Sequence, residues 1–455
     1  MDSYFCILYP FSRMTQAAGL CFFIAFFGTE DDLNMKQQQQ QAVIVGVHLP
    51  ERTDFASSME ELRSLAEACQ VQVVDELSQK AVRINPSHYI GTGKLQELAA
   101  LLEAYEEAFV IFNDELSPSQ IRNLEAALKR KVIDRTMLIL DIFAERAKTR
   151  EAQLQVEVAQ LQYMLPRLVG LRASLGRQGG GAGLRNRGAG ETKLELDRRR
   201  IEERIAALQS ELEKLVARRQ VQRKQRRKND IPVVCLVGYT NTGKSSLMNA
   251  LVERYNPQPE KQVLARDMLF ATLETSVRSI ELPDRKSFLL TDTVGFVSGL
   301  PHHLVKAFRS TLEEVAEADL LIHVVDFSNP DHEKQIEVTN DTLRELGADH
   351  IPMIYAFNKL DITEHPYPQV QDGSVYLSVR ERKGIDELVG MIREQIFSSY
   401  VQREIVIPYD QGRLVAYFNE HAHVQETSYE PEGTRLRLEC KAADYEKYRA
   451  HFIEL

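Results

Sequence analysis

The chain has 455 residues, of which 44% are hydrophobic and 27% charged, as is ordinary for a soluble globular protein of about two to four domains. This composition excludes a fully disordered chain and a small domain stapled by disulfides. The five cysteines are scattered, and no two have the spacing of a zinc knuckle or a redox pair. We therefore expect plain thiols in a reducing compartment, the cytoplasm.

The net charge of −10 conceals a basic segment. Residues 166–228 contain 18 Lys and Arg against 7 Asp and Glu, a local charge of +11, so the rest of the chain sums to −21. A basic segment in an acidic protein indicates a polyanionic partner for that segment. The alternative is a solvated helix face.

Residues 1–41 are predicted to be a leader outside the folded domains. The apolar run at 17–28 has 12 residues, whereas a helix needs about 20 to span a bilayer. We favour translation from Met35, followed by a disordered glutamine tract at 37–41. A targeting or membrane-anchoring peptide and an ordinary packed segment remain as alternatives.

Residues 42–150 alternate apolar runs with helical patterns, which predicts a small α/β domain. The expected strands are 42–47, 71–74, 108–112 and 132–133, and the expected helices are 59–68, 94–104 and 118–128. The string Gly91-Thr-Gly-Lys94 precedes a helix and could cradle a phosphate on helix amides. Because it lacks the full spacing of a phosphate loop, a simple turn and helix start is the favoured interpretation.

Residues 151–229 predict an antiparallel helical hairpin. Leucine, valine and isoleucine recur in heptad-like steps over 154–168 and again over 201–215, so two helices are expected to pack together. Glycine lets the backbone approach a phosphate closely, and arginine pairs with phosphates bidentately. The segment 170–190 between the helices has 8 of the 23 glycines and Arg172, Arg177, Arg185 and Arg187. We expect a flexible tip loop that contacts nucleic acid, with a passive linker as the alternative.

Residues 231–399 contain a phosphate-binding motif in the required context. The apolar strand 233–237 runs into Gly238-Tyr-Thr-Asn-Thr-Gly-Lys-Ser245 and then into a helix. Backbone amides of such a loop wrap the phosphates, the lysine reaches the β- and γ-phosphates, and the Ser245 hydroxyl binds Mg²⁺. The predicted nucleotide-binding residues here are Gly238, Tyr239, Thr240, Asn241, Thr242, Gly243, Lys244, Ser245 and Ser246.

A second strand ends in Asp292-Thr-Val-Gly295. Asp292 is expected to hold Mg²⁺ through water, and the Gly295 amide to bond the γ-phosphate and so sense hydrolysis. Thr272, with Thr275 as the runner-up, would supply its hydroxyl to Mg²⁺ and its amide to the γ-phosphate. The further nucleotide-binding residues are Phe270, Ala271, Thr272, Asp292, Thr293, Val294 and Gly295; the catalytic groups are Lys244, Thr272 and Gly295, and the metal ligands are Ser245, Thr272 and Asp292.

A third strand, 353–357, leads into Asn358-Lys-Leu-Asp361. A carboxylate here can accept two N–H bonds from a guanine edge, a pattern that adenine cannot supply. A further strand at 375–378 ends in Ser378-Val-Arg380, where GTPases usually have Ser-Ala-Lys. The predicted base-binding residues are Asn358, Lys359, Asp361, Ser378, Val379 and Arg380. The ligands are therefore GTP or GDP with Mg²⁺; an ATPase with a chance Asn-Lys-x-Asp is the alternative.

Phe296 follows Gly295, where signalling GTPases keep a glutamine that orients the attacking water. Phenylalanine cannot bond water, so hydrolysis must rely on Mg²⁺, backbone positioning and groups lent by a partner. A partner's arginine accelerates other GTPases by about 10³–10⁵. We expect slow intrinsic turnover that rises when the basic tip is bound.

Residues 404–455 predict a small α+β appendage without recognisable chemistry. Its expected strands are 405–407 and 434–439, and its expected helix is 413–419. The fold class is thus α/β: a P-loop GTPase domain preceded by a small α/β domain and an antiparallel helical hairpin, and followed by this appendage.

The chain resembles the HflX family of GTPases over residues 42–400, and more weakly to 455. The matching strings are 91–94, 112–120, 134–136, 141–144, 160–167, 188–193, 238–245, 270–273 and 292–296. The resemblance implies a GTPase that binds the large ribosomal subunit, contacts ribosomal RNA with its N-terminal region, and splits ribosomes stalled under stress. A hydrophobic residue after the Asp-x-x-Gly motif is also a trait of that family.

These observations favour a monomeric ribosome-associated GTPase in the cytoplasm, with membrane association not favoured. The competing hypothesis is a membrane- or scaffold-associated regulatory GTPase. In it, residues 17–28 serve as an anchor and the hairpin as a protein-interaction arm. Salt-sensitive binding to ribosomes separates the two, because contacts with phosphates weaken steeply as salt rises.

Overall fold

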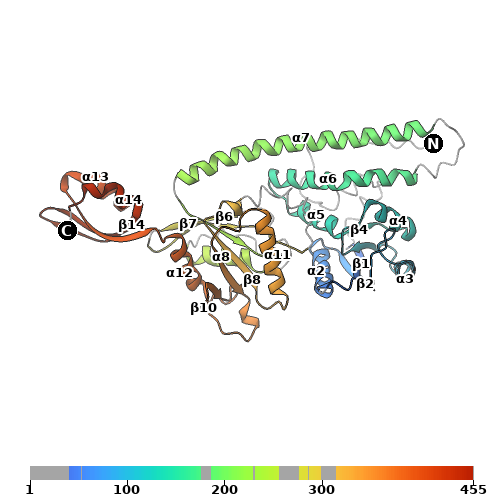
Figure 1. Ribbon diagram of the computed structural model, residues 1–455, viewed down its shortest axis with the longest axis horizontal. Coiled ribbons are helices and arrows are strands. Elements are labelled where there is room, and N and C mark those ends of the chain that lie inside the picture. Colours follow the sequence, from blue (N-terminus) through green and yellow to red (C-terminus); the bar gives the residue numbers. More distant parts are fainter. Residues whose placement is uncertain are drawn as a thin grey trace. The chain divides into compact units, whose positions relative to one another are not determined.

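The computed structural model describes residues 40–52, 54–175, 186–228, 231–255, 276–284, 286–298 and 314–453. The chain divides into two compact units, residues 1–209 and 210–455, and each is described by itself. Figure 1 labels their helices and strands. Of the predicted leader, residues 1–39 lie outside the described residues, including the apolar run at 17–28 and Met35.

The first unit begins with a four-stranded parallel sheet in the order β2-β1-β3-β4. Its elements are β1 (Gln41–His48), α2 (Phe55–Ala68), β2 (Gln72–Lys80), α3 (Thr92–Glu103), β3 (Phe109–Phe112), α4 (Pro118–Leu128), β4 (Val132–Asp134) and α5 (Arg135–Arg146). The central strands β1 and β3 are almost wholly buried, which explains their continuous apolar runs. The predicted strands and helices are present, although β1 takes in Gln41, the last residue of the predicted leader.

Helix α5 was absent from the sequence-based prediction. Its residues from Arg135 to Phe143 are all buried, so most of the segment lacks the exposed polar face of a surface helix. Its start is set by Asp134, whose side chain accepts a hydrogen bond from the Met137 amide at 2.9 Å.

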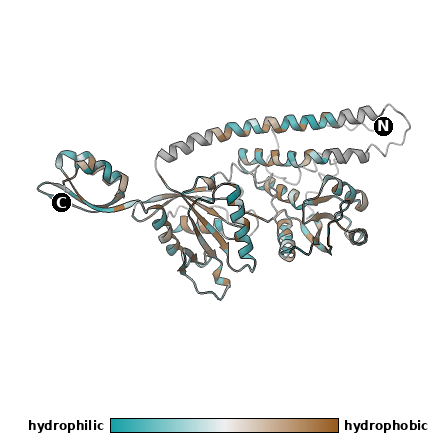
Figure 2. Ribbon diagram, in the orientation of Figure 1, coloured by the Kyte–Doolittle hydropathy of each residue, from teal (hydrophilic) through white to brown (hydrophobic). Residues whose placement is uncertain are grey.

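Two long helices follow, α6 (Arg150–Leu175) and α7 (Asn186–Lys228). Leu154 and Val158 of α6 and Ile201 and Ile205 of α7 are buried, as the heptad pattern predicts. Arg204 donates two hydrogen bonds to Glu157 Oε1, at 2.9 and 2.7 Å, and so joins the helices. Figure 2 shows hydrophobic residues along the strands and hydrophilic ones along much of α7.

The glycine-rich loop predicted at 170–190 is wrong at both ends. Residues 170–175 and 186–190 are helical, and 176–185 lie outside the described residues. The segment 171–175 reads Leu-Arg-Ala-Ser-Leu, which has good helix propensity. At the other end, α7 includes Gly188 and Gly190. Extending an existing helix by one residue costs less free energy than forming a new helix nucleus.

The second unit is built on a seven-stranded sheet in the order β10-β11-β9-β8-β5-β7-β6, in which only the edge strands β6 and β10 run antiparallel to their neighbours. Its elements are β5 (Val233–Val237), α8 (Lys244–Tyr255), β6 (Ser276–Glu281), β7 (Ser287–Asp292), β8 (Leu320–Asp326), α11 (His332–Glu345), β9 (Met353–Asn358), β10 (Gln369–Gln371), β11 (Ser374–Tyr376) and α12 (Ile385–Ile396). The carboxyl ends of the parallel strands meet at one edge, which is where ligands bind in such sheets. Strand β11 ends two residues before the predicted strand end at Ser378.

The C-terminal segment is an antiparallel three-stranded sheet in the order β12-β14-β13, covered by two helices. Its elements are β12 (Tyr400–Ile407), α13 (Gly412–His421), β13 (His423–Glu430), β14 (Gly433–Lys441) and α14 (Ala442–Tyr448). The sequence-based prediction lacked β13 and α14. Every residue of β13 is at least partly exposed, so the strand has no apolar face to reveal it.

One buried lysine fastens this segment to the seven-stranded sheet. Lys286, at the turn between β6 and β7, donates a 2.6 Å hydrogen bond to Glu439 of β14. Its ammonium also lies 5.2 and 5.1 Å from the ring centres of Phe397 and Tyr400.

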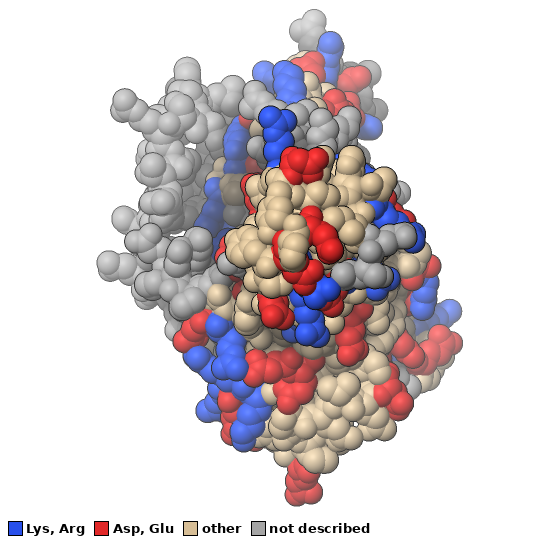
Figure 3. Space-filling view, turned by 90° about the vertical axis from the view of Figure 1, so that its left-hand side faces the viewer, with Lys and Arg blue, Asp and Glu red and all other residues tan. Residues whose placement is uncertain are grey.

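On the face seen in Figure 3, basic and acidic side chains are interspersed, so the described residues there form no single basic patch.

Candidate functional site

The phosphate loop at 238–245 joins β5 to α8 in a conformation that requires glycine. Gly238 and Gly243 have φ of +141° and +98°. A Cβ would lie 2.3 Å from the Val324 carbonyl oxygen at Gly238, and 2.4 Å from Asn358 Nδ2 at Gly243. The loop therefore lies tightly against its neighbours and leads into the N-terminus of α8, a position suited to binding phosphate.

Lys244 is buried at the first position of α8. Its Nζ donates to the carbonyl oxygens of Gly238 at 3.0 Å and Tyr239 at 2.6 Å. Burial lowers the pKa of Lys244 to about 8, while the charge of Asp292 opposes the shift. The same Tyr239 carbonyl accepts a 3.1 Å hydrogen bond from the Thr242 hydroxyl.

The hydroxyl of Ser245 and the carboxylate of Asp292 face each other at the start of α8 and the end of β7. Ser245 Oγ donates to Asp292 Oδ2 at 2.6 Å. Asp292 is fully buried, and the neighbouring Thr293 hydroxyl donates to the Leu236 carbonyl of β5 at 2.7 Å. Hydroxyl and carboxylate oxygens are ligands that Mg²⁺ prefers, so this donor pair fits the ion.

The segment after β7 packs directly on the phosphate loop. A Cβ on Gly295 would lie 2.8 Å from Thr240 Cα and 3.0 Å from Lys244 Nζ. Phe296 accepts a 2.8 Å hydrogen bond from the Thr240 amide and donates one of 3.1 Å to the Gly238 carbonyl. The Phe296 side chain is only 3% exposed, so it offers no surface to water.

Two sets of side-chain contacts involve the predicted base-binding residues other than Lys359. Asn358 Nδ2 donates to the Thr242 carbonyl at 2.9 Å, and Asn358 Oδ1 accepts from the Val379 amide at 3.0 Å. The Ser378 hydroxyl donates to Asp361 Oδ1 at 2.7 Å, and the Arg380 guanidinium lies 3.8 Å from Asp361 Oδ2. Asn358 thus links the phosphate loop to the loops that hold Asp361.

The structure brings most of the predicted site residues to the carboxyl edge of the seven-stranded sheet, while Ser246 is exposed on the first turn of α8. Phe270, Ala271 and Thr272 lie outside the described residues.

Sequence reasoning missed Asp326, which ends β8 and pairs with Lys359 Nζ at 2.8 Å. It also missed His323, a buried neighbour of Lys244 whose pKa falls to about 3, mainly through burial. A strand ending in aspartate at the same sheet edge could have revealed Asp326.

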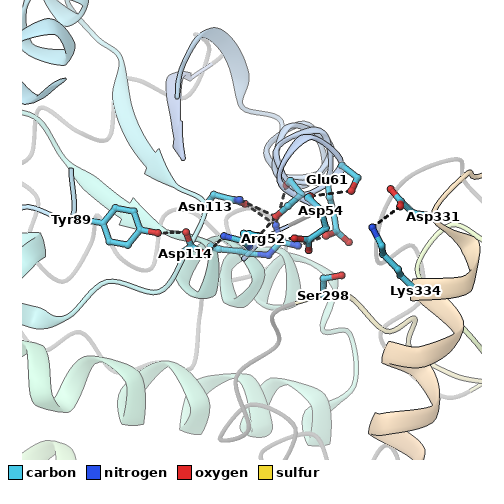
Figure 4. Close-up of polar contacts among 12 residues, drawn as sticks. Arg52, Asp54, Glu61, Tyr89, Asn113, Asp114, Ser298, Asp331 and Lys334 are labelled. Carbon is cyan, nitrogen blue, oxygen red and sulfur yellow. Dashed lines mark hydrogen bonds and ion pairs between the residues drawn. The ribbon is translucent and has the colours of Figure 1, made fainter. Parts of the chain in front are cut away.

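A different polar cluster lies at the carboxyl edge of the four-stranded sheet (Figure 4). Arg52 donates to Asp114 at 2.6 Å, and the Tyr89 hydroxyl binds the other oxygen of that carboxylate. Arg135 donates to Asn113 at 3.1 Å. These charged groups satisfy one another and hold the loops after β1 and β3.

The motif at Gly91–Lys94 is a turn and helix start, as favoured from the sequence. The Gly91 amide donates to the Gln79 side chain at 2.9 Å. Lys94 pairs with Glu97 of the same helix at 2.8 Å.

Comparison with known proteins gives three consecutive family matches. Profiles described as GTP-binding GTPase N-terminal, GTP-binding GTPase Middle Region and 50S ribosome-binding GTPase match residues 56–144, 146–226 and 233–359. Among solved structures, a GTP-binding protein from the archaeon Sulfolobus solfataricus in complex with GDP is 24% identical. The match covers 79% of this chain and 99% of that one, with a TM-score of 0.42.

The GTPase HflX of Caldanaerobacter subterraneus is 43% identical over 420 residues, which is 92% of this chain and 95% of that protein. The GTPase HflX of Escherichia coli K12 is 39% identical over 415 residues, with coverage of 90% and 95%. Within the described ranges, the helices include none with the length and apolar character needed to cross a membrane. Similarity of this extent shows that the chain belongs to the HflX family of GTPases and hydrolyses GTP.

Proposed function

We propose that this GTPase is a GTP-driven switch that binds the large ribosomal subunit and splits or rescues stalled ribosomes. The observation that carries the proposal is the match of residues 233–359 to a profile described as 50S ribosome-binding GTPase. The local charge of +11 over residues 166–228 supports it, because ribosomal RNA is a polyanion.

In the proposed site, Lys244 binds the β- and γ-phosphates, and amides of the phosphate loop wrap them. The contacts of Lys244 with the loop carbonyls keep its ammonium at the start of α8. The Gly295 amide binds the γ-phosphate, since this glycine lies against Thr240 beside Lys244.

Ser245, Asp292 and Thr272 would hold Mg²⁺, Asp292 through water. The fit rests on the 2.6 Å approach of the Ser245 hydroxyl to the Asp292 carboxylate. When bound, Mg²⁺ neutralises charge that develops on the phosphate oxygens.

Guanine is read by the Asp361 carboxylate. Its hydrogen bond from Ser378 and the nearby Arg380 support a charged, oriented acceptor. A buried acceptor left unpaired by adenine costs affinity, so GTP is preferred to ATP.

Intrinsic hydrolysis is slow, because the buried Phe296 ring replaces a side chain that would orient water. The hairpin of α6 and α7 carries the partner contact, with the arginines at 172, 177, 185 and 187 on ribosomal RNA. Binding to the subunit then supplies the group that orients the attacking water, which Phe296 cannot do.

The test is GTP turnover with and without purified large ribosomal subunits, with small subunits as the control particle. We expect large subunits alone to raise turnover by at least about tenfold, since lent groups in other GTPases give about 10³–10⁵. A variant with the four tip arginines changed to alanine should lose the stimulation.

The matched control changes four exposed arginines of the second unit, Arg254, Arg344, Arg382 and Arg393, to alanine. This control should keep the stimulation. Turnover that is already fast without subunits, or that small subunits raise equally, would contradict the proposal.

A further inference from the structure

We propose that Tyr239 is a positioning residue for GTP hydrolysis, which holds the segment that follows Gly295 against the phosphate loop. It acts through its hydroxyl on Ser298 and through the backbone bridge that its loop forms with Phe296. The inference rests on the proposed contact of the Gly295 amide with the γ-phosphate. The phosphate-loop motif itself leaves the residue after its first glycine unspecified, so it assigns Tyr239 no role of this kind.

The side chain of Tyr239 makes a double contact across the site. Its hydroxyl lies 2.6 Å from Ser298 Oγ and also accepts a 2.6 Å hydrogen bond from the Ser298 amide. Tyr239 is 5% exposed, so its ring is packed in place and the phenol reaches Ser298 from a fixed position. The contact joins two segments that are 59 residues apart in the chain.

The backbone makes a second connection between the same segments. The Thr240 amide donates to the Phe296 carbonyl at 2.8 Å, and the Phe296 amide donates to the Gly238 carbonyl at 3.1 Å. These bonds continue the parallel pairing of β5 with β7 beyond the ends of both strands. Gly295 is therefore held between the paired strands on one side and the Tyr239–Ser298 contact on the other.

Tyr239 also fixes the phosphate-binding lysine. Its carbonyl accepts hydrogen bonds from Lys244 Nζ and from the Thr242 hydroxyl. A substitution that removes only the hydroxyl leaves these backbone contacts in place. Because Gly295 is assigned to the γ-phosphate and Lys244 to both the β- and γ-phosphates, loss of the hydroxyl should weaken GTP binding and spare GDP binding.

The test uses Tyr239→Phe, with the dissociation constants of GDP and of a non-hydrolysable GTP analogue, and the rate of GTP turnover. We expect analogue binding to weaken about fivefold, as for the loss of a neutral hydrogen bond, and turnover to fall by a similar factor. GDP binding should stay within about twofold of the wild type.

Three further variants complete the design. Ser298→Ala removes only the Oγ contact and keeps the amide bond to the phenol, so its effect should be smaller than that of Tyr239→Phe. The double variant should be no worse than Tyr239→Phe, and Ser298→Thr, which keeps a hydroxyl, should bind as the wild type does. The matched control is Tyr255→Phe, which removes a hydroxyl that binds Asp386 at 3.3 Å at the last position of α8. It should leave both nucleotides and turnover unchanged.

Equal weakening of GDP and the analogue by Tyr239→Phe would overturn the proposal, because the hydroxyl would then only maintain the phosphate loop. A rise in turnover, or additive effects in the double variant, would also overturn it. Gly295→Ala separates this failure from that of the parent assignment. If Gly295→Ala leaves the ratio of the two affinities unchanged, Gly295 does not contact the γ-phosphate and both fail. If Gly295→Ala changes the ratio of the two affinities but Tyr239→Phe does not, only the positioning role of Tyr239 fails.

Discussion

The four-stranded and seven-stranded sheets of this chain carry different kinds of polar group at their carboxyl edges. At the edge of the four-stranded sheet, Arg52 and Asp114 neutralise each other, and the surrounding polar groups are hydrogen-bonded within the cluster. At the edge of the seven-stranded sheet, glycines with positive φ hold a loop against Val324 and Asn358, and a buried lysine lies at the start of a helix. The four-stranded sheet thus carries a network of mutually bonded polar groups, and the seven-stranded sheet carries a nucleotide site. The difference arises because function depends on the loops that follow the strands and not on the architecture of the sheet.

The largest expected effect comes from breaking the closed network. Arg135→Ala removes the buried guanidinium that pairs with Glu61, which should destabilise the first unit by about 3–5 kcal/mol. Thermal and denaturant unfolding would measure the loss. Arg63→Ala, which removes a more exposed pair with Glu76 at 3.0 Å, is the control and should cost under about 1 kcal/mol. Equal losses in the two variants would mean that the network is not the stabilising feature.

A second prediction concerns pH and the same unit. Burial raises the pKa of Asp141 from 3.8 to about 7. The unfolded carboxyl ionises above about pH 4 while the folded one stays protonated, so stability should fall as pH rises from about 4 to 7. The total penalty is up to about 4 kcal/mol for a shift of this size. Asp141→Asn should flatten this decline, as measured by denaturant unfolding at a series of pH values. A decline of unchanged slope in the variant would exclude Asp141 as its source.

The third prediction concerns the nucleotide site. Gly243→Ala places a Cβ 2.4 Å from Asn358 Nδ2 at a φ of +98°, so the loop must shift. Displacement of a catalytic group by about 1 Å can lower a reaction rate about 100-fold, and we expect nucleotide affinity to fall by the same order. Gly347→Ala is the matched control, because its φ is also positive at +71° and nothing lies within 4 Å of the new Cβ. Loss of GTP binding in both variants would point to general backbone strain.

The smallest expected effect is the pH dependence of nucleotide binding. Burial lowers the pKa of Lys244 from 10.5 to about 8. Phosphates bind the charged form, so affinity should be constant below about pH 8 and fall by up to about tenfold per pH unit above it. Titration with a fluorescent GDP between pH 7 and 9 would measure this. Affinity that stays flat to pH 9 would show that Lys244 keeps its proton in the free protein.

Sequence patterns predicted what depends on local chemistry. Strand β5 and helix α4 have the predicted bounds, and the phosphate loop and the Asn358–Asp361 loop lie at the expected sheet edge. The alternation of apolar runs with helical patterns and the spacing of glycines are both local signals.

What the sequence could not reveal depends on packing. Helix α5 is buried along most of its length, so it lacks the exposed polar face of a surface helix. The sequence predicted that Phe296 cannot orient water, but not that its backbone pairs with Gly238 and Thr240. That pairing exists because β5 and β7 are neighbours, and Tyr239 meets Ser298 for the same reason. Long-range adjacency of this kind leaves no periodic signal.

The most direct test of the proposed switch is sedimentation of the protein with large ribosomal subunits in a non-hydrolysable GTP analogue, in GDP and without nucleotide. The account predicts strongest binding with the analogue, and a steep loss of binding as salt rises, because contacts with RNA phosphates release counterions. Equal binding in all three conditions, or no binding at moderate salt, would contradict it.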